Sequence, residues 1–264
     1  MYKKTSGRRS KNLFNPTSPE TFKLSRSKIE MFMSCPRCFY IDRRLGIGRP
    51  SMPGFTLNTA VDELYKKEFD EHRRAGTPHP IMTEHGIEAV PYDHHMMNEW
   101  RENFKGVQVH HQPTNLIITG AVDDIWIDAH KHLIVVDYKA TSTTAEITLD
   151  SEYRQAYKRQ MEIYQWLMRK SGFTVSDMSY FVYANGDKSK PNFNKKLEFN
   201  VQLIPYKGND DWVEKTIVKA KECLMHQELP APNPHCEYCL YRTAAQEEEV
   251  IKPASPKNES NTLF

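Results

Sequence analysis

Residues 115–138 read NLIITGAVDDIWIDAHKHLIVVDY, and Lys139 follows them. Two apolar runs rich in β-branched residues, 116–127 and 133–136, flank a short polar segment at residues 128–131. Apolar runs joined by a short polar turn predict an antiparallel β-hairpin. The rest of the fold is predicted outward from this hairpin.

Carboxylates interrupt the apolar runs. Asp123 and Asp124 lie on the first strand, and Asp137 lies near the end of the second with Lys139 two residues later. A buried carboxylate is unfavourable without a partner, and hard divalent cations take oxygen ligands. Residues two apart point to the same face of a strand, so Asp137 and Lys139 share a face while Asp124 points away from Asp123. We expect a hydrolytic metal site at Asp123 and Asp137, and a solvated or salt-bridged Asp124.

Three short motifs follow one another in an order typical of one enzyme family. They are Gly120-x-x-Asp123, Asp137-x-Lys139 and Gln160-x-x-x-Tyr164. The set resembles the PD-(D/E)XK nuclease superfamily, in its RecB-like and AddB-like exonuclease branch, over roughly residues 24–242. The resemblance implies an α/β, restriction-endonuclease-like core with a central mixed β-sheet flanked by helices. It also implies a deoxyribonuclease that uses Mg²⁺ or Mn²⁺, with exonuclease and endonuclease action both open.

The resemblance also implies roles for single residues. Asp123, Asp137 and the backbone carbonyl of Tyr138 would bind the metal ion, and Lys139 would orient the attacking water and bind the scissile phosphate. Many relatives carry a metal-binding histidine on an early helix, where this chain has Asp62 in the nearest register and Asn58 as a weaker candidate. A solvated carboxylate on an amphipathic helix is the alternative interpretation of Asp62.

Gln160 and Tyr164 resemble the element of RecB-like enzymes that lies beside the catalytic lysine and the DNA. They are four residues apart, so they lie one helical turn from each other. The alternative is a hydrogen-bonded pair within the core. Both interpretations place the two side chains on the inner face of a helix.

Five cysteines are unevenly distributed. Cys35 with Cys38, and Cys236 with Cys239, form two C-x-x-C pairs, and Cys223 stands alone in a predicted helix as a core residue. Four thiolates suit either one Zn²⁺ or a four-iron cluster. A clasp between the two ends resembles the iron–sulfur site of AddB-type and CRISPR adaptation nucleases, which favours a 4Fe-4S cluster over zinc. Those relatives usually supply one N-terminal and three C-terminal cysteines, whereas this chain has two and two.

Composition limits the class of protein. The 264 residues carry a formal charge of +2, 39% hydrophobic residues and a mean hydropathy of −0.69, and no apolar run approaches a membrane span. We expect a soluble, cytoplasmic protein with a flexible basic arm at residues 1–23, a nuclease domain at 24–245 and a disordered tail at 246–264. DNA is the expected partner. A helicase or another repair, recombination or defence protein would be separate, because no P-loop motif is present.

A second function remains open: a catalytically silent nucleic-acid-binding or scaffold module with a structural metal clasp. The combined presence of Asp123, Asp137 and Lys139 favours the enzyme, because a silent site has no chemical need for all three.

Apolar periodicity predicts the remaining elements. The first helix should begin in a capping box of Ser27 and Glu30 and bury Ile29, Phe32 and Met33. Further helices are expected at residues 58–75, 93–105, 151–171 and 211–228, strands at 107–111, 178–183 and 199–204, and a loop at 76–91.

Overall fold

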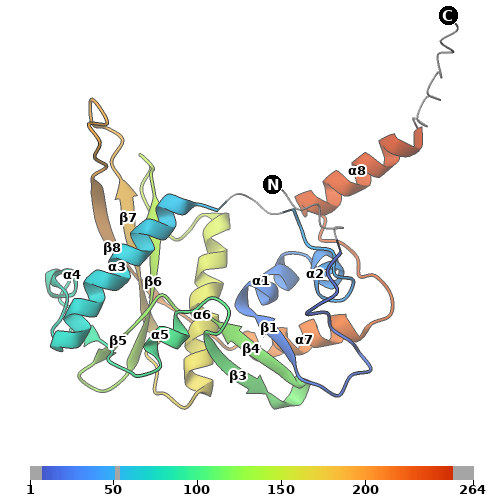
Figure 1. Cartoon of the computed structure of the whole chain (residues 1–264), viewed down its shortest axis with the longest axis horizontal. Helices are drawn as coiled ribbons and strands as arrows, with labels where there is room; N and C mark the ends of the chain where they lie inside the picture. Colours follow the sequence, from blue (N-terminus) through green and yellow to red (C-terminus); the bar gives the residue numbers. More distant parts are fainter. Residues whose placement is uncertain (1–7, 51–53, 252–264) are drawn as a thin grey trace, which may run out of the picture.

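The computed structural model describes residues 8–50 and 54–251 and arranges them around two β-sheets (Figure 1). The larger sheet has five strands in the order β2-β5-β6-β7-β8, and the smaller has three in the order β1-β4-β3. Both sheets mix parallel and antiparallel pairs. The predicted class, an α/β fold with a central mixed sheet flanked by helices, is confirmed.

The five-stranded sheet is centred on β6, the strand that carries the predicted catalytic pair. Strands β5 and β6 form the expected antiparallel hairpin, from Asp124 opposite Val136 to Ile127 opposite Leu133. Strand β7 then pairs parallel to β6. The strands are β2 (Ala89–Pro91), β5 (Asp124–Asp128), β6 (Leu133–Thr141), β7 (Met178–Gly186) and β8 (Phe199–Lys207).

The predicted single strand over residues 116–127 is wrong. It divides into β4 (Leu116–Gly120), which joins the small sheet with β1 (Phe22–Ser25) and β3 (Val107–His111), and β5, which joins the large one. The break follows Gly120, where an added Cβ would lie 2.7 Å from the Tyr164 ring, so the chain passes directly against a helix there. Asp123 therefore lies in a connection between the two sheets.

Two long helices cover opposite faces of the large sheet. Helix α3 (Thr56–Ala75) packs Tyr65 and Phe69 against one face, and α6 (Gln155–Lys170), preceded by the short η2 (Glu152–Arg154), covers the other. The sheet is thus buried on both sides, as near-continuous apolar strands require. Both helices match their predicted ranges closely.

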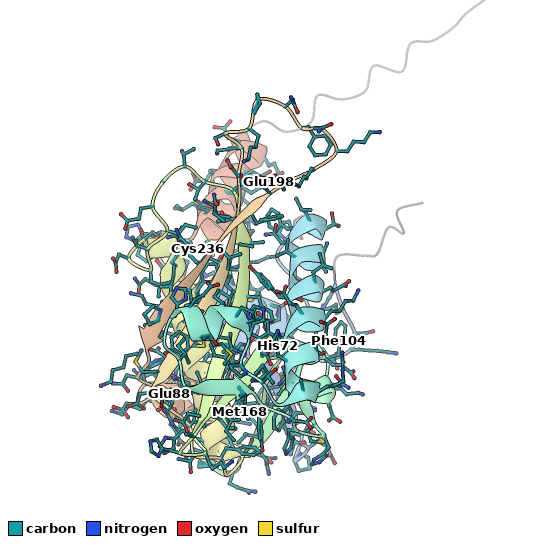
Figure 2. The ribbon with its side chains drawn as sticks, turned by 90° about the vertical axis from the view of Figure 1, so that its left-hand side faces the viewer. His72, Glu88, Phe104, Met168, Glu198 and Cys236 are labelled. Carbon is teal, nitrogen blue, oxygen red and sulfur yellow. The ribbon has the colours of Figure 1, made fainter. Side chains whose placement is uncertain are left out.

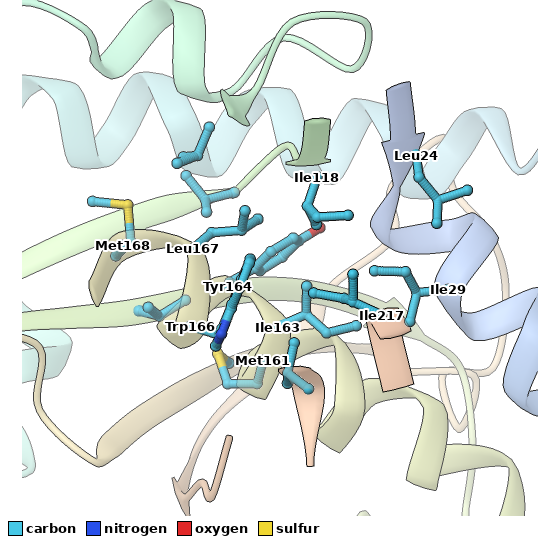
Figure 3. Close-up of a cluster of buried hydrophobic side chains, with 14 of the residues drawn as sticks. Leu24, Ile29, Ile118, Met161, Ile163, Tyr164, Trp166, Leu167, Met168 and Ile217 are labelled. Atoms are coloured by element: carbon cyan, nitrogen blue, oxygen red, sulfur yellow. The ribbon is translucent and has the colours of Figure 1, made fainter. Parts of the chain in front are cut away.

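The main core forms where α6 meets the small sheet and the first helix (Figure 3). Its labelled members come from β1, α1, β4, α6 and α7, which are distant in sequence: Leu24, Ile29, Ile118, Met161, Ile163, Tyr164, Trp166, Leu167, Met168 and Ile217. Packing of α6 in this core fixes the helix that faces the predicted catalytic strand.

Three of the N-terminal and C-terminal helices lie together beside this core: α1 (Arg26–Ser34), α2 (Pro36–Arg43) and α7 (Val213–Met225). Helix α8 (Glu237–Ile251) begins near α2 and extends away from it (Figure 1). The expected capping box is wrong: α1 begins at Arg26 after Ser25, and Glu30 instead binds Arg159 of α6 at 2.7 Å. Met33 is exposed, while Ile29 is buried as predicted.

Three predicted segments differ in extent. Residues 93–105 contain only the short α5 (Met97–Trp100), and the expected loop at 76–91 contains α4 (Pro80–Glu84) and β2. Strand β7 continues past residue 183, where the predicted strand ends, and its pairing extends to Gly186 opposite Phe199. A short η1 (Gln112–Thr114) links β3 to β4.

The ends of the described chain are more structured than expected. Phe14 is buried and Arg9 binds the Asp42 carboxylate at 2.9 Å, so residues 8–23 contribute to the fold. Helix α8 continues to Ile251, through part of the predicted tail. The remaining residues of both predicted flexible ends, 1–7 and 252–264, lie outside the described part. Within the described ranges, no helix has the length and apolar character needed to cross a bilayer.

Candidate active site and cysteine cluster

Strand alternation directs the side chains of Asp137 and Lys139 toward α6. Their neighbour Tyr138 points to the opposite face and stacks on Tyr65 of α3. Asp137 has no exposed surface; the Lys139 ammonium contacts its Oδ2, and Gln160 Nε2 donates to its Oδ1 at 2.7 Å. Asp137, Lys139 and Gln160 therefore form one hydrogen-bonded group, in which Gln160 lies beside the predicted catalytic pair.

Asp123 approaches the same group from the connection between the sheets. Its Oδ2 accepts a hydrogen bond from the Tyr138 backbone N–H at 3.0 Å, which places Asp123 beside Asp137 in space although the two are fourteen positions apart in the chain. Burial and the nearby Asp123 together outweigh the opposing charge of Lys139 and raise the pKa of Asp137 to about 7. The two acids thus converge, and one ammonium only partly compensates their charge.

Lys139 remains a cation in this environment. Burial alone would lower its pKa, but Asp137 and Asp123 outweigh burial and raise the pKa above its ordinary value. Its ammonium also lies 4.7 Å from the centre of the Tyr157 ring. A protonated lysine can donate hydrogen bonds and stabilise negative charge, but it cannot act as a general base.

Tyr164 belongs to the same group of buried side chains. Gln160 Nε2 lies 3.2 Å from the Tyr164 hydroxyl, and the Arg26 guanidinium lies 5.9 Å from the centre of its ring. Both Gln160 and Tyr164 are almost fully buried. Their positions agree with a hydrogen-bonded core pair and also with orientation of Asp137. Gly120 makes room for the Tyr164 ring, which explains the glycine three residues before Asp123.

Asp62 faces the site from α3. It binds Lys66 one turn away at 2.7 Å, and the Lys66 ammonium lies 4.0 Å from Asp123 Oδ1. Burial and the charge of Asp123 raise the pKa of Asp62, so this carboxylate is not simply solvated. Asn58, the weaker candidate, instead donates to the Ala140 carbonyl at 3.2 Å and tethers α3 to β6.

Sequence reasoning missed Lys66, although its spacing from Asp62 was visible as an i, i+4 pair. It also missed the ion network around Asp124, which is fully buried between Arg73 at 2.5 Å and Arg101 at 2.9 Å. Asp124 is therefore salt-bridged, one of the two predicted outcomes. Arg101 Nε also donates to the Asp123 carbonyl at 3.0 Å, so this network fixes the backbone that carries Asp123.

The residues present fit a hard divalent cation. Asp123 and Asp137 offer oxygen atoms, and a cation would offset the two causes that raise the pKa of Asp137, which are burial and then the charge of Asp123. In the described ranges, no set of three carboxylates brings its ligand atoms within 4.8 Å of one another. Two carboxylates are enough for Mg²⁺, because this ion keeps several water ligands.

The four paired cysteines meet at a second site, as predicted. Cys35 and Cys38 come from the start of α2, and Cys236 and Cys239 from the start of α8; all four are buried, and their sulfur atoms lie within 4.8 Å of one another. Closest Sγ···Sγ distances are 3.6 Å between Cys38 and Cys236 and 3.7 Å from Cys239 to Cys35 and to Cys38. Cys223 lies apart in the main core, as expected.

The cysteine cluster suits a metal held by thiolates. Burial and the neighbouring Cys38 and Cys35 raise the pKa of Cys239 to about 12, so four thiolates cannot coexist there without a compensating positive charge. A tetrahedral Zn²⁺ with Zn–S bonds near 2.3 Å places its sulfur atoms about 3.8 Å apart, close to the spacing found. Arg49 lies 3.8 Å from Cys236 Sγ and adds a further positive charge.

The family model described as the PD-(D/E)XK nuclease superfamily matches residues 23–244, which is most of the chain. Comparison with curated proteins finds no match. Among solved structures, the crystal structure of LHK-Exo in complex with dAMP is 15% identical, with 85% of this chain and 94% of that chain covered and a TM-score of 0.34.

Proposed function

The chain belongs to the PD-(D/E)XK nuclease superfamily, and from that premise we propose that it hydrolyses DNA phosphodiester bonds at Asp123, Asp137 and Lys139. One observation supports the proposal above the others. Asp137 is fully buried, yet it contacts Lys139 and Gln160 and lies beside Asp123, so two acids and one ammonium share a single centre. A structural role alone gives no reason to bury this group.

The Asp123 and Asp137 carboxylates and the Tyr138 carbonyl would hold Mg²⁺ or Mn²⁺, and Asp62 is a further candidate ligand. A bound divalent ion lowers the pKa of water and offsets charge on phosphate oxygens. Arg101 and Tyr138 hold Asp123 in place through its carbonyl and its carboxylate. This support limits the motion of the acid that lies outside any strand.

Lys139 supplies a fixed positive charge to the reaction. Because its pKa is raised, the ammonium stays protonated, donates to a nonbridging phosphate oxygen and stabilises the developing charge there. Gln160 orients Asp137 through the 2.7 Å hydrogen bond and is in turn placed by Tyr164. Water adds across one P–O ester bond, so the products are a phosphomonoester and an alcohol.

The proposal extends to the setting of the enzyme. Similarity of its motifs to RecB-like and AddB-like enzymes supports a role in DNA repair, recombination or defence. Such enzymes handle DNA ends and strands, so DNA is the proposed substrate, and a separate helicase or related protein is the proposed partner.

The cysteine cluster is proposed as a structural metal centre that joins α2 to α8. Resemblance to the AddB-type clasp supports a 4Fe-4S cluster, whereas the 3.6–3.7 Å sulfur spacing supports a single zinc ion. Anaerobically purified protein separates the two. Iron–sulfur chemistry gives a brown protein with broad visible absorption and iron by metal analysis, while zinc gives a colourless protein with about one zinc per chain.

A cleavage assay tests the catalytic proposal. Purified full-length protein with Mn²⁺ or Mg²⁺ should degrade end-labelled single- or double-stranded DNA, and Asp137→Asn and Lys139→Gln should each lower the rate at least about a hundredfold. Asp150→Asn serves as the matched control, because Asp150 is an exposed carboxylate in the loop before α6 and should leave the rate unchanged. Parent protein that binds DNA but never cleaves it would favour the silent binding module instead.

A further inference from the structure

The hairpin of β7 and β8 extends beyond the body of the protein at the active-site end of the sheet. In Figure 1 it projects beyond the ends of the other strands of the large sheet, and Figure 2 shows side chains around its tip and labels Glu198. We name residues 187–198, which connect the two strands, the β7–β8 arm. Every residue of the arm from 188 to 198 is exposed.

Strand register relates the arm to the site. Lys139 of β6 lies opposite Tyr183 of the parallel β7. Both strands therefore run toward the same end of the sheet, where β7 continues into the arm. Phe193 at the tip is ten residues beyond Tyr183. An extended chain rises about 3.3 Å per residue, so the tip lies at most about 33 Å from the Lys139 position. That reach corresponds to roughly ten base-pair steps of duplex.

Internal bonds shape the arm. The backbone N–H of Asp187 donates to the Glu198 carbonyl at 2.8 Å and continues the strand ladder, and Lys196 N–H donates to the Phe193 carbonyl at 2.9 Å and closes the tip. Lys190 and Lys196 bind the Glu198 carboxylate at 2.9 and 2.8 Å. The arm is thus a loop between the two strands, and these backbone hydrogen bonds and ion pairs connect its two sides.

The charge of the arm is unusually positive for this chain. Its twelve residues contain four lysines and two carboxylates, a net charge of +2, which equals the net charge of all 264 residues. Asp187 and Glu198 are engaged by Lys190 and Lys196. Among the residues that the structure describes, Lys188 and Lys195 have no carboxylate partner. These two ammonium groups are available for an external anion.

Phe193 presents an aromatic ring beside these charges. Its side chain is 73% exposed, between Asn192 and Asn194, whereas Leu197 of the same arm packs back toward Gly186. Aromatic rings interspersed with cations form the usual binding surface for single-stranded nucleic acid, because rings stack on bases while cations contact phosphates. A base within a duplex already stacks on its neighbours, so an unpaired base suits this ring.

The geometry points to the β7–β8 arm as a binding element for single-stranded DNA that flanks the active site: Phe193 stacks on an unpaired base, and Lys188 and Lys195 bind the adjoining phosphates. This inference rests on the proposed nuclease function for its choice of nucleic acid. It adds a contact well away from the reacting phosphate, and it predicts a preference for substrates with an unpaired strand.

Binding to a labelled phosphorothioate single strand of about 20 nucleotides, long enough to span the reach of the arm, provides the test. Fluorescence anisotropy of the full-length protein should show Phe193→Ala weakening affinity between about fivefold and about 150-fold, the range for loss of one stacked base. Phe193→Trp should retain affinity, whereas Phe193→Leu, which keeps an apolar side chain without a ring, should not. Phe104→Ala is the matched control, because Phe104 is 94% exposed but lies elsewhere (Figure 2).

The lysines are tested through salt dependence. The double variant Lys188→Ser with Lys195→Ser should reduce the slope of log affinity against log salt by about 1.4, since each phosphate contact on a single strand contributes about 0.7. Lys215→Ser with Lys219→Ser on the exposed face of α7 is the control pair and should leave the slope unchanged.

Hydrolysis of bis(p-nitrophenyl) phosphate, a single phosphodiester too short to reach the arm, separates this inference from the catalytic proposal. Arm variants should hydrolyse it at the parent rate. Parent protein that cleaves DNA while arm variants bind the long strand as tightly as the parent would overturn the arm inference and leave the nuclease intact. Loss of strand binding in arm variants of a protein that never cleaves would support the arm and reject the nuclease.

Discussion

Substitution of Gly120 by alanine tests the close contact between β4 and α6. The added Cβ would lie 2.7 and 2.9 Å from two carbons of the Tyr164 ring and 2.8 Å from Leu167 Cδ1. Both neighbours are almost fully buried, so neither can move without disturbing the core. Overpacking of this kind destabilises a protein by about 1–3 kcal/mol. At about 2–4 °C per kcal/mol for a chain of this size, the melting temperature should fall by about 2–12 °C.

The same substitution should lower activity more than stability. Displacement of Tyr164 shifts Gln160 and, through it, Asp137, and a shift near 1 Å in a catalytic group lowers the rate by about a hundredfold. Differential scanning calorimetry and DNA cleavage at a temperature where the variant is fully folded measure the two effects. Gly54→Ala is the control, because an added Cβ there meets nothing within 4 Å. A Gly120→Ala protein with parental melting temperature and cleavage rate would refute the packing argument.

Three further predictions concern stability. Asp124→Asn leaves Arg73 and Arg101 without their fully buried anion and should destabilise the fold by about 3–5 kcal/mol in urea unfolding at neutral pH. A loss below about 1 kcal/mol would show that Asp70, which both arginines also bind, is a sufficient partner for them. Burial opposes ionisation of Asp42, but the neighbouring Lys28 and Arg43 outweigh burial and lower the pKa of Asp42 below its ordinary value of 3.8. The ionised carboxylate therefore stabilises the fold fully above pH 3.8, and this stabilisation is lost as the pH falls through the lowered pKa. The stability difference between the parent and Asp42→Asn should therefore be constant near neutral pH and shrink in acid; a difference that grows in acid would reverse the sign. Cys239→Ser should reduce both the metal content and the melting temperature, and a chelator should lower the melting temperature of the parent protein by a similar amount. A variant with parental metal content and parental melting temperature would exclude a metal role for this thiol.

Local rules account for the parts of the site that lie within one element. Alternation along a strand predicted that Asp137 and Lys139 share a face, and helical spacing predicted that Gln160 and Tyr164 lie one turn apart. Both pairs occur as expected. The meeting of the two pairs was predicted only through family resemblance, because a strand and a helix more than twenty residues apart have no local rule that brings them together.

The parts that sequence reasoning missed depend on tertiary packing. Apolar residues flank Gly120 and the two aspartates on both sides, so the local pattern of residues 116–127 did not reveal that the chain changes sheets between Gly120 and Asp124. Nothing in the sequence assigned Lys66 and Arg101 to the site, because lysine and arginine side chains usually lie on the surface. Only the tertiary structure places Lys66 near Asp123 and Arg101 against Asp124. The cysteines were easier, since paired thiols at each end of a chain have few other uses.

The cysteine cluster sets an order of events for a newly made chain. Cys38 and Cys239 are separated by 201 positions, and at a synthesis rate of about 5–20 residues per second the second pair follows the first by about 10–40 s. During that interval the first two thiols have no native partners and are open to oxidation or to capture of the wrong ion. Binding of the proposed metal by all four cysteines can therefore only follow synthesis of the second pair, and the ion supplied at that moment would determine which metal joins α2 to α8.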